Sequence, residues 1–177
     1  LTPDGNVKMF TTPTDQATGT TSWNNDTAPA DDGVLVEVIS DTDGDSNTAT
    51  LVNTTVRADP YNAAVLCNNL NAHGHTDWYL PAYNELAVLQ TNHVAIGGFN
   101  TSGWPNSRYW SSTEPNDSFG DTNAKTREMP SGTASNDKSS NISVRCVRSE
   151  NTLDHTPTAS PFTDENGAAV STLIESN

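Results

Sequence analysis

The sequence predicts a mixed α+β domain, and three observations point to it. Short β-branched stretches recur between turn-rich segments of Thr, Asn, Asp and Gly, as expected of short strands. Two stretches with near-helical apolar spacing lie among them. The hydrophobic fraction is only 33%, but the aromatic residues gather in short clusters, so the chain has material for a core. Two helices among short strands and long loops indicate α+β architecture.

The first half of the chain is expected to form two strands and then a helix. The strands are predicted at residues 7–10 and 34–39, and the segment 11–33 between them is loop by composition, interrupted only by Trp23. Asp59-Pro60 is a helix start, because Asp caps free N–H groups and Pro tolerates the first helical position. The apolar face then carries Ala63, Ala64, Leu66, Cys67 and Leu70, and Gly74 is expected to end the helix.

The second half is expected to hold one more helix and three closing strands. Trp78–Leu80 is strand-like, and Pro81 opens a helix that carries Tyr83, Leu86 and Leu89. Residues 91–108 are rich in turn residues. The closing strands are predicted at 109–113, at about 123–129 and at 142–148.

The charge balance restricts the partners that the chain can bind. It has 22 acidic and 8 basic residues, a formal net charge of −14, which repels nucleic-acid phosphates and anionic lipids. No run approaches the roughly 18 apolar residues that a membrane span needs. We therefore expect no nucleic acid partner and no direct membrane insertion. Metal cations, cationic partners and neutral sugars remain compatible.

Three motifs carry a family resemblance. They are His73-Gly-His-Thr-Asp-Trp-Tyr-Leu-Pro-Ala-Tyr-Asn-Glu-Leu86, Tyr109-Trp-Ser-Ser-Thr-Glu114 and Val144-Arg-Cys-Val-Arg148. Together they resemble the Lcl-type C-terminal domain family of bacterial surface and secreted proteins over roughly residues 1–150. This resemblance implies a C-type-lectin-like fold, in which two helices pack on short, mostly antiparallel strands with long loops. It extends, more distantly, to the formylglycine-generating-enzyme superfamily.

The cysteine inventory is two residues, Cys67 and Cys146. An even number in a polar, lysine-poor chain suits an oxidising compartment, and the alternatives are one disulfide or two buried thiols. The family resemblance favours the disulfide, because such folds tie the first helix to a late core strand. The distant relatives that are enzymes need reactive cysteines, so a Cys67–Cys146 bridge predicts that this chain is not an enzyme.

The composition changes after Arg148, which divides the chain into three parts. We expect a C-type-lectin-like domain over 1–150, a Ser/Thr/Pro/Asp linker over 151–160, and a strand-forming tail over 161–177. The tail resembles the opening strands of bacterial extracellular β-sandwich repeats but has too few strands to close one. It belongs either to a truncated next domain or to a contact between subunits.

A metal site is a candidate between the early elements. Oxygen side chains recur at alternate positions around Gly44, as Ca²⁺ loops require: Asp41, Asp43, Asp45 and Asn47. The alternative is an Asx-turn loop that joins two strands.

A metal pair of His73 and His75 is disfavoured, because a single intervening Gly gives poor convergent geometry. These histidines are expected to serve the helix end and the following turn.

Aromatic and acidic residues offer further site hypotheses. Four aromatic residues form either a sugar-stacking platform or core packing: Trp78, Tyr79, Tyr109 and Trp110. We expect core packing for Trp78 and Trp110. Trp104, between Gly103 and Pro105, is the candidate for an exposed contact. Glu85 and Glu114 have no Ser, Cys or His partner at a telling spacing, which argues against paired catalytic carboxylates.

Recognition is expected in the region 104–138, where lectin-like folds display ligand-contacting side chains. Family relatives show Ala-Trp there, but here Ala124 is followed by Lys125, so a polar surface replaces the expected aromatic. The candidate ligand-binding residues are Trp104, Arg108, Asn116, Asp117, Phe119, Asp121, Asn123, Lys125, Arg127 and Lys138, with Asn136 beside them; the alternative is a solvated loop surface.

The sequence therefore predicts a non-enzymatic adhesion module outside the cell or on its surface, with a glycan or protein ligand on another surface. The alternative is a structural subunit of an extracellular filament or stalk, self-assembled through the 161–177 segment. An unpaired strand exposes backbone donors and acceptors that a neighbour's open sheet edge satisfies.

Overall fold

The computed structural model describes residues 1–24, 36–54, 60–117 and 122–150, and in this part the chain has four helices and seven short strands. The helices are α1 (Gly44–Asn53), α2 (Asn62–Asn68), α3 (Tyr83–Thr91) and α4 (His93–Ile96). The strands are β1 (Met9–Thr11), β2 (Ala17–Thr21), β3 (Arg108–Trp110), β4 (Asn123–Glu128), β5 (Thr133–Asp137), β6 (Ile142–Val144) and β7 (Val147–Ser149). The predicted α+β class is confirmed.

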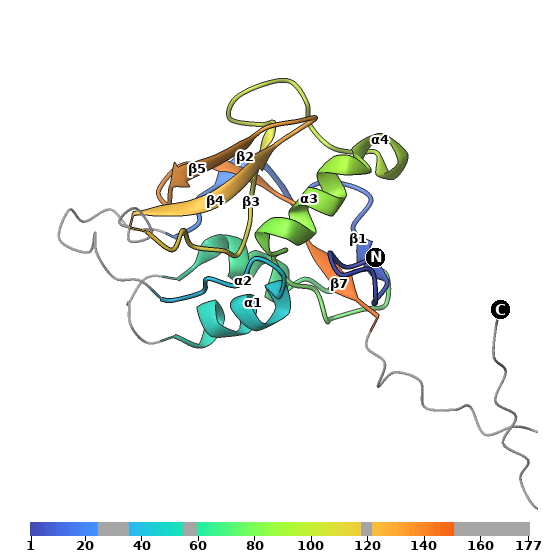
Figure 1. Ribbon diagram of the computed structural model, residues 1–177, viewed down its shortest axis with the longest axis horizontal. Helices are drawn as coiled ribbons and strands as arrows, with labels where there is room; N and C mark the ends of the chain where they lie inside the picture. The colour runs from blue at the N-terminus through green and yellow to red at the C-terminus, as the bar shows by residue number, and fades with distance from the viewer. Residues whose placement is uncertain (25–35, 55–59, 118–121, 151–177) are drawn as a thin grey trace, which may run out of the picture.

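The strands form two sheets. The larger has the order β2-β6-β3-β4-β5, and all its pairings are antiparallel except β3 with β6. The smaller pairs β1 with β7. In Figure 1 the larger sheet lies to one side of α1 and α2, and α3 runs between it and the β1–β7 pair. The domain is therefore layered, with helices on a mostly antiparallel sheet.

The core consists of two clusters that share β3. Trp110 joins Trp23, Trp78 and the disulfide in the cluster beside α1 and α2. Its neighbour Tyr109 joins Leu86 of α3 in the second cluster. Successive strand residues point to opposite faces of a sheet, so these two neighbours feed different clusters.

The four aromatic residues that could form either core or a sugar-stacking platform are all buried. Trp78 is 5% exposed, Tyr79 3%, and Tyr109 and Trp110 are fully buried. The core prediction is confirmed, and the sugar-stacking alternative is wrong for these rings.

The region of residues 36–53 differs from the prediction. The expected strand over 34–39 is wrong where the structure describes it, since 36–39 form no strand; residues 34 and 35 lie outside the described part. The N–H groups of Val36 and Val38 instead bond the Glu114 carboxylate, at 3.1 and 3.3 Å. The loop expected around Gly44 begins helix α1, which Asp43 caps by accepting a 3.0 Å hydrogen bond from the Ser46 N–H.

The late strands are also divided differently. The strand predicted over 142–148 is two strands, β6 and β7, which belong to different sheets. The interruption is Arg145-Cys146, where one side chain forms buried hydrogen bonds and the other forms the disulfide. Strand β2 lies within the predicted loop, and β5 was not predicted at all.

The helix that was expected to end at Gly74 ends earlier. Helix α2 stops at Asn68, and Gly74 lies in a tight turn in which Ala72 pairs with His75. His73 and Gly74 both have positive φ, 55° and 79°, as such a turn requires. The glycine therefore shapes a turn after the helix.

A disulfide joins Cys67 of α2 to Cys146, between β6 and β7, across a sequence separation of 79 residues. Both cysteines are fully buried in the cluster beside α1 and α2. The bridge that the family resemblance implied is therefore present. It connects α2 to the junction between β6 of the larger sheet and β7 of the smaller one.

Removing the disulfide is expected to lower the free energy of unfolding by about 4 kcal/mol, the loop-closure entropy of a bridge of this length. Denaturant titration of Cys67→Ala/Cys146→Ala against the unaltered chain measures the difference. Adding reductant should destabilise the unaltered chain and leave the double variant unchanged. Equal midpoints for both oxidised proteins would contradict the expectation.

Candidate functional site

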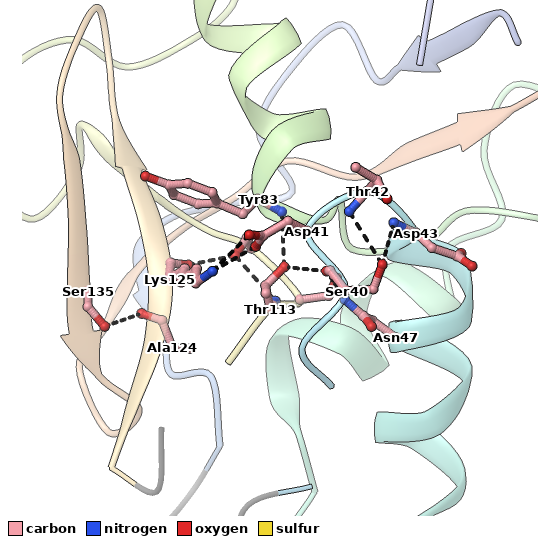
Figure 2. Close-up of polar contacts among 12 residues, drawn as sticks. Ser40, Asp41, Thr42, Asp43, Asn47, Tyr83, Thr113, Ala124, Lys125 and Ser135 are labelled. Atoms are coloured by element: carbon pink, nitrogen blue, oxygen red, sulfur yellow. Dashed lines mark hydrogen bonds and ion pairs between the residues drawn. The ribbon is translucent and has the colours of Figure 1, made fainter. Parts of the chain in front are cut away.

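A groove of about 530 Å³ crosses the surface of β4 and β5 next to the start of α3. Its lining combines one aromatic ring with hydroxyl, amide and charged groups: Tyr83, Pro115, Asp117, Asn123, Lys125, Thr133, Ala134 and Ser135. Figure 2 shows Tyr83 beside Lys125, with Ser135 across the strand pair. A larger groove of about 610 Å³, between β2 and α2, has neither an aromatic nor a charged side chain in its lining.

The ring of Tyr83 is flanked by two cations. The Arg127 guanidinium lies 4.0 Å from the ring centroid and the Lys125 ammonium 5.3 Å. Arg127 is held in place by hydrogen bonds to the Tyr83 carbonyl, at 3.0 Å, and to the Gln90 side chain, at 3.1 Å. Both cations thus favour one orientation of a partly buried aromatic ring.

Lys125 also joins the groove to the segment before α1. Its ammonium group contacts both carboxylate oxygens of Asp41, at 2.8 and 2.9 Å (Figure 2). Both side chains are partly exposed. The charge of Lys125 is therefore neutralised within the protein, and the groove has little net attraction for an anion.

One hydroxyl group, that of Thr113, connects the elements that form the base of the groove. Thr113 Oγ1 accepts a hydrogen bond from the Tyr83 N–H at 3.0 Å and donates to the Ser40 carbonyl at 2.9 Å (Figure 2). The Lys125 N–H donates to the Thr113 carbonyl at 2.9 Å. Helix α3, the segment before α1 and strand β4 are thus fixed relative to one another at the groove.

A buried carboxylate lies behind the base of the groove. Glu85 accepts hydrogen bonds from the N–H of Ala82 at 2.8 Å, the N–H of Gly44 at 3.2 Å and the hydroxyl of Tyr79 at 3.0 Å. It therefore ties the beginning of α1 to the beginning of α3. Burial raises the pKa of Glu85 from its usual 4.5 to about 7, and the N–H donors oppose that rise only in part.

The predicted ligand-binding residues divide between the two faces of the larger sheet. Lys125 opposes Ser135, and Arg127 opposes both Thr133 and Tyr109, so these side chains share the face that α3 covers. Asp117 and Asn123 also line this groove.

Other predicted residues lie away from the groove. Arg108 opposes Glu128 and projects to the other face, where Trp104, 56% exposed, stacks on its guanidinium at 5.0 Å. Asn136 accepts a 3.0 Å hydrogen bond from Arg108 on that face. Trp104 is thus exposed as predicted, but in a different place from Lys125.

The remaining predicted ligand-binding residues are Lys138, Asn116, Phe119 and Asp121. Lys138 is buried, and its ammonium group pairs with Glu114 at 2.6 Å, so its assignment to a ligand site is corrected to an internal ion pair. Asn116 is exposed beside the groove. Phe119 and Asp121 lie outside the described residues.

Three of the four residues proposed for calcium have separate partners. Asp41 pairs with Lys125, and Asp43 caps α1. Asp45 lies on the surface in the first turn of the helix, and partial desolvation, together with the carboxylates of Asp43 and Asp77, raises its pKa. Asn47 is buried and donates to the Ser40 carbonyl at 2.8 Å. Within the described ranges no group of three or more His, Cys, Asp or Glu could hold a metal ion, and calcium binding stays a prediction.

Glu85 and Glu114 do not form a pair. Glu85 bonds the helix N-termini, and Glu114 bonds Lys138 and the residue 36–38 backbone. Sequence reasoning missed Tyr83 as a groove residue and Asp41 as the ion-pair partner of Lys125. The helical spacing marks Tyr83 only as an apolar helix position, and nothing in the sequence relates either residue to Lys125.

The raised pKa of Glu85 predicts a pH-dependent stability. The folded state keeps this proton up to pH 7, whereas the unfolded chain releases it near pH 4.5. The contribution of Glu85 to the free energy of unfolding is therefore fully present below pH 4.5. Up to about 3 kcal/mol of it is lost as the pH rises through 7. Glu85→Gln mimics the protonated acid and removes this component. Urea unfolding from pH 5 to 8 measures both proteins, and parallel curves would contradict the assignment.

The comparisons with known proteins agree with the geometry. None of the helices in the described part of the chain is long and apolar enough to cross a membrane. A comparison with curated proteins finds no match. A family model, the Lcl C-terminal domain, matches residues 11–148, and this domain is generally a non-catalytic module. The match covers more than half of the chain and includes every described helix and most of the strands. The chain belongs to the Lcl C-terminal domain family.

Proposed function

We propose that this chain is a non-enzymatic extracellular binding or adhesion module, and that its groove beside Tyr83 holds a glycan or protein ligand displayed on another surface. The observation that carries the proposal is the partly buried ring of Tyr83, which lies between Lys125 and Arg127. A ring held in one orientation offers contact area at little cost in conformational entropy.

The chemistry of the groove favours a ligand that is rich in hydroxyl or amide groups. Thr133 and Ser135 contribute hydroxyl groups from an exposed strand, and Asn123 contributes an amide. Lys125 is neutralised by Asp41, and Asp117 adds a negative charge. A strongly anionic ligand would gain little from Lys125, the one cation in the described groove lining, because Asp41 already pairs with it.

The extracellular assignment is supported by the disulfide. Disulfides persist in oxidising compartments and are rare where thiols are kept reduced. Cys67–Cys146 closes a long loop in a domain with a small apolar fraction, so its stability depends on that environment.

The non-enzymatic assignment is supported by the state of the acidic side chains. Glu85 and Glu114 are buried, at 3% and 0% exposure, and their oxygens bond groups of the protein itself. Within the described groove lining, no Ser–His or Cys–His pair offers an activated nucleophile.

Two substitutions test the groove. Tyr83→Ala removes the ring and Lys125→Ala removes the adjacent cation, and each is expected to weaken ligand binding at least about tenfold. A glycan and matrix-protein array identifies the ligand, and titration of that ligand gives the Kd. Matched controls are Lys8→Ala, an exposed ion-paired lysine at the N-terminal end, and Trp104→Ala on the other face of the sheet. An array without binding, or binding that only Trp104→Ala abolishes, would overturn the proposed groove.

A second candidate function is a structural subunit of an extracellular filament or stalk. The observation that favours it is strand β5, which forms an edge of the larger sheet and is exposed along its length at Thr133, Ser135 and Asp137. A free edge can pair with a strand from another chain. The two candidates are compatible, because the groove uses the side chains of Thr133 and Ser135, whereas edge pairing uses their backbone groups.

A further inference from the structure

The two edge strands of the larger sheet differ in how regularly they pair with their neighbouring strands. Strand β5 pairs with β4 through five consecutive residue pairs without a register shift. Strand β2, at the opposite edge, pairs with β6 only at Ala17 and Thr21, with a shift between them. A bulge makes a strand a poor template for another chain, whereas a regular strand is a good one.

The backbone groups of β5 that face away from β4 can be identified from Lys125. The Lys125 N–H donates to the Thr113 carbonyl, and its own carbonyl accepts from the Ser111 N–H, so both groups point away from β5. Lys125 opposes Ser135 in the ladder. In an antiparallel pair, residues that do not bond each other direct their N–H and C=O groups outward. The N–H and C=O groups of Ser135 therefore point out from the sheet edge.

The side chains of β5 leave this edge open. Its sequence is Thr-Ala-Ser-Asn-Asp, with neither the Lys nor the Pro that commonly blocks edge pairing. The one charge, Asp137, stands at the end of the strand. At the β2 edge, in contrast, the register shift between Ala17 and Thr21 interrupts the ladder. Among the described residues, the sheet thus has an irregular edge at β2 and a regular edge at β5.

We propose that the open edge of β5 accepts residues 168–174 from the C-terminal segment of a second copy of this chain, as an added strand. This inference rests on the second candidate function and names its acceptor and donor. Each added residue pair would satisfy the outward N–H and C=O groups of Thr133 and Ser135.

The sequence of the donor segment suits this edge. Residues 168–174 are Ala-Ala-Val-Ser-Thr-Leu-Ile, which contain no charge and no Pro and include three β-branched side chains. Copies of a chain with a net charge of −14 repel each other, so an uncharged segment is the part best able to dock. Residues 168–172 of this segment have short side chains, as β5 does.

The location of the two ends favours pairing between copies. Figure 1 shows β7, after which the chain continues to the C-terminus, on the opposite side of the domain from β5. Residues 151–177 would span up to about 90 Å when extended, enough to reach a neighbouring domain. Donor and acceptor are different surfaces, so the contact is head-to-tail and repeats into an open filament.

Complementary variants of the full chain test the proposal. Ser135→Pro removes an outward N–H at an edge position that tolerates Pro, and gives a chain that can donate but not accept. Val170→Pro/Thr172→Pro gives a chain that can accept but not donate. Each is expected to be monomeric by light scattering after size exclusion, whereas an equal mixture forms a 1:1 dimer and the unaltered chain forms longer species.

Matched controls separate pairing from other effects. Ser135→Ala keeps the backbone N–H, and Thr152→Pro places a proline outside the donor segment, so both are expected to assemble like the unaltered chain. An unaltered chain that is monomeric at every concentration, or variants that do not dimerise when mixed, would overturn the proposal. Tyr83→Ala should assemble normally while losing ligand, which distinguishes failure of the edge from failure of the groove.

Discussion

Four consecutive polar residues, Ser111 to Glu114, run through the interior with their side chains fully buried. Each finds a partner in a different part of the chain. Ser111 bonds the Lys125 carbonyl of β4 at 2.7 Å, Asn47 of α1 donates to Ser112 at 3.2 Å, and Thr113 and Glu114 bond the residue 36–40 segment and Lys138. Buried polar groups are costly unless bonded, so this segment accepts few alternative arrangements of its neighbours.

The candidate groove inherits its geometry from that segment. Thr113 fixes the start of α3, where Tyr83 lies, and the Glu114 carboxylate holds the backbone that leads to Asp41. Glu85, on the buried side of the groove, adds a second connection between the starts of α1 and α3. The two sides of the groove are thus joined through buried hydrogen bonds rather than through the ligand, and binding requires little reorganisation.

Local signals in the sequence predict some of this architecture and miss the parts that depend on long-range pairing. Pro81 predicts the start of α3, and the Trp and Tyr motifs predict the core, because these residue types act through local sterics and apolar area. Helix α1 is missed because Asp, Asn and Thr have low helix propensity, which the Asp43 cap and burial of Leu51 overcome. Lys125 and Arg108 were predicted in one ligand surface, but the β3–β4 register places them on opposite faces. A register depends on contacts between distant residues, which a single sequence does not display.

The basic residues of the described chain are used internally, and this limits what the surface can recognise. Arg145 is fully buried against Asp15 at 2.7 Å and stacks on Phe99, and Arg148 bonds Asp77. Lys138 is buried with Glu114, and Lys125 is paired with Asp41. These ion pairs stabilise an acidic, polar chain, and water screens them least where both partners are buried, as in Arg145–Asp15 and Lys138–Glu114. Recognition by such a surface must depend on aromatic contact, on hydroxyl and amide hydrogen bonds and on open backbone edges. Because these interactions are short-ranged and nearly independent of salt, they fit the extracellular binding function proposed above.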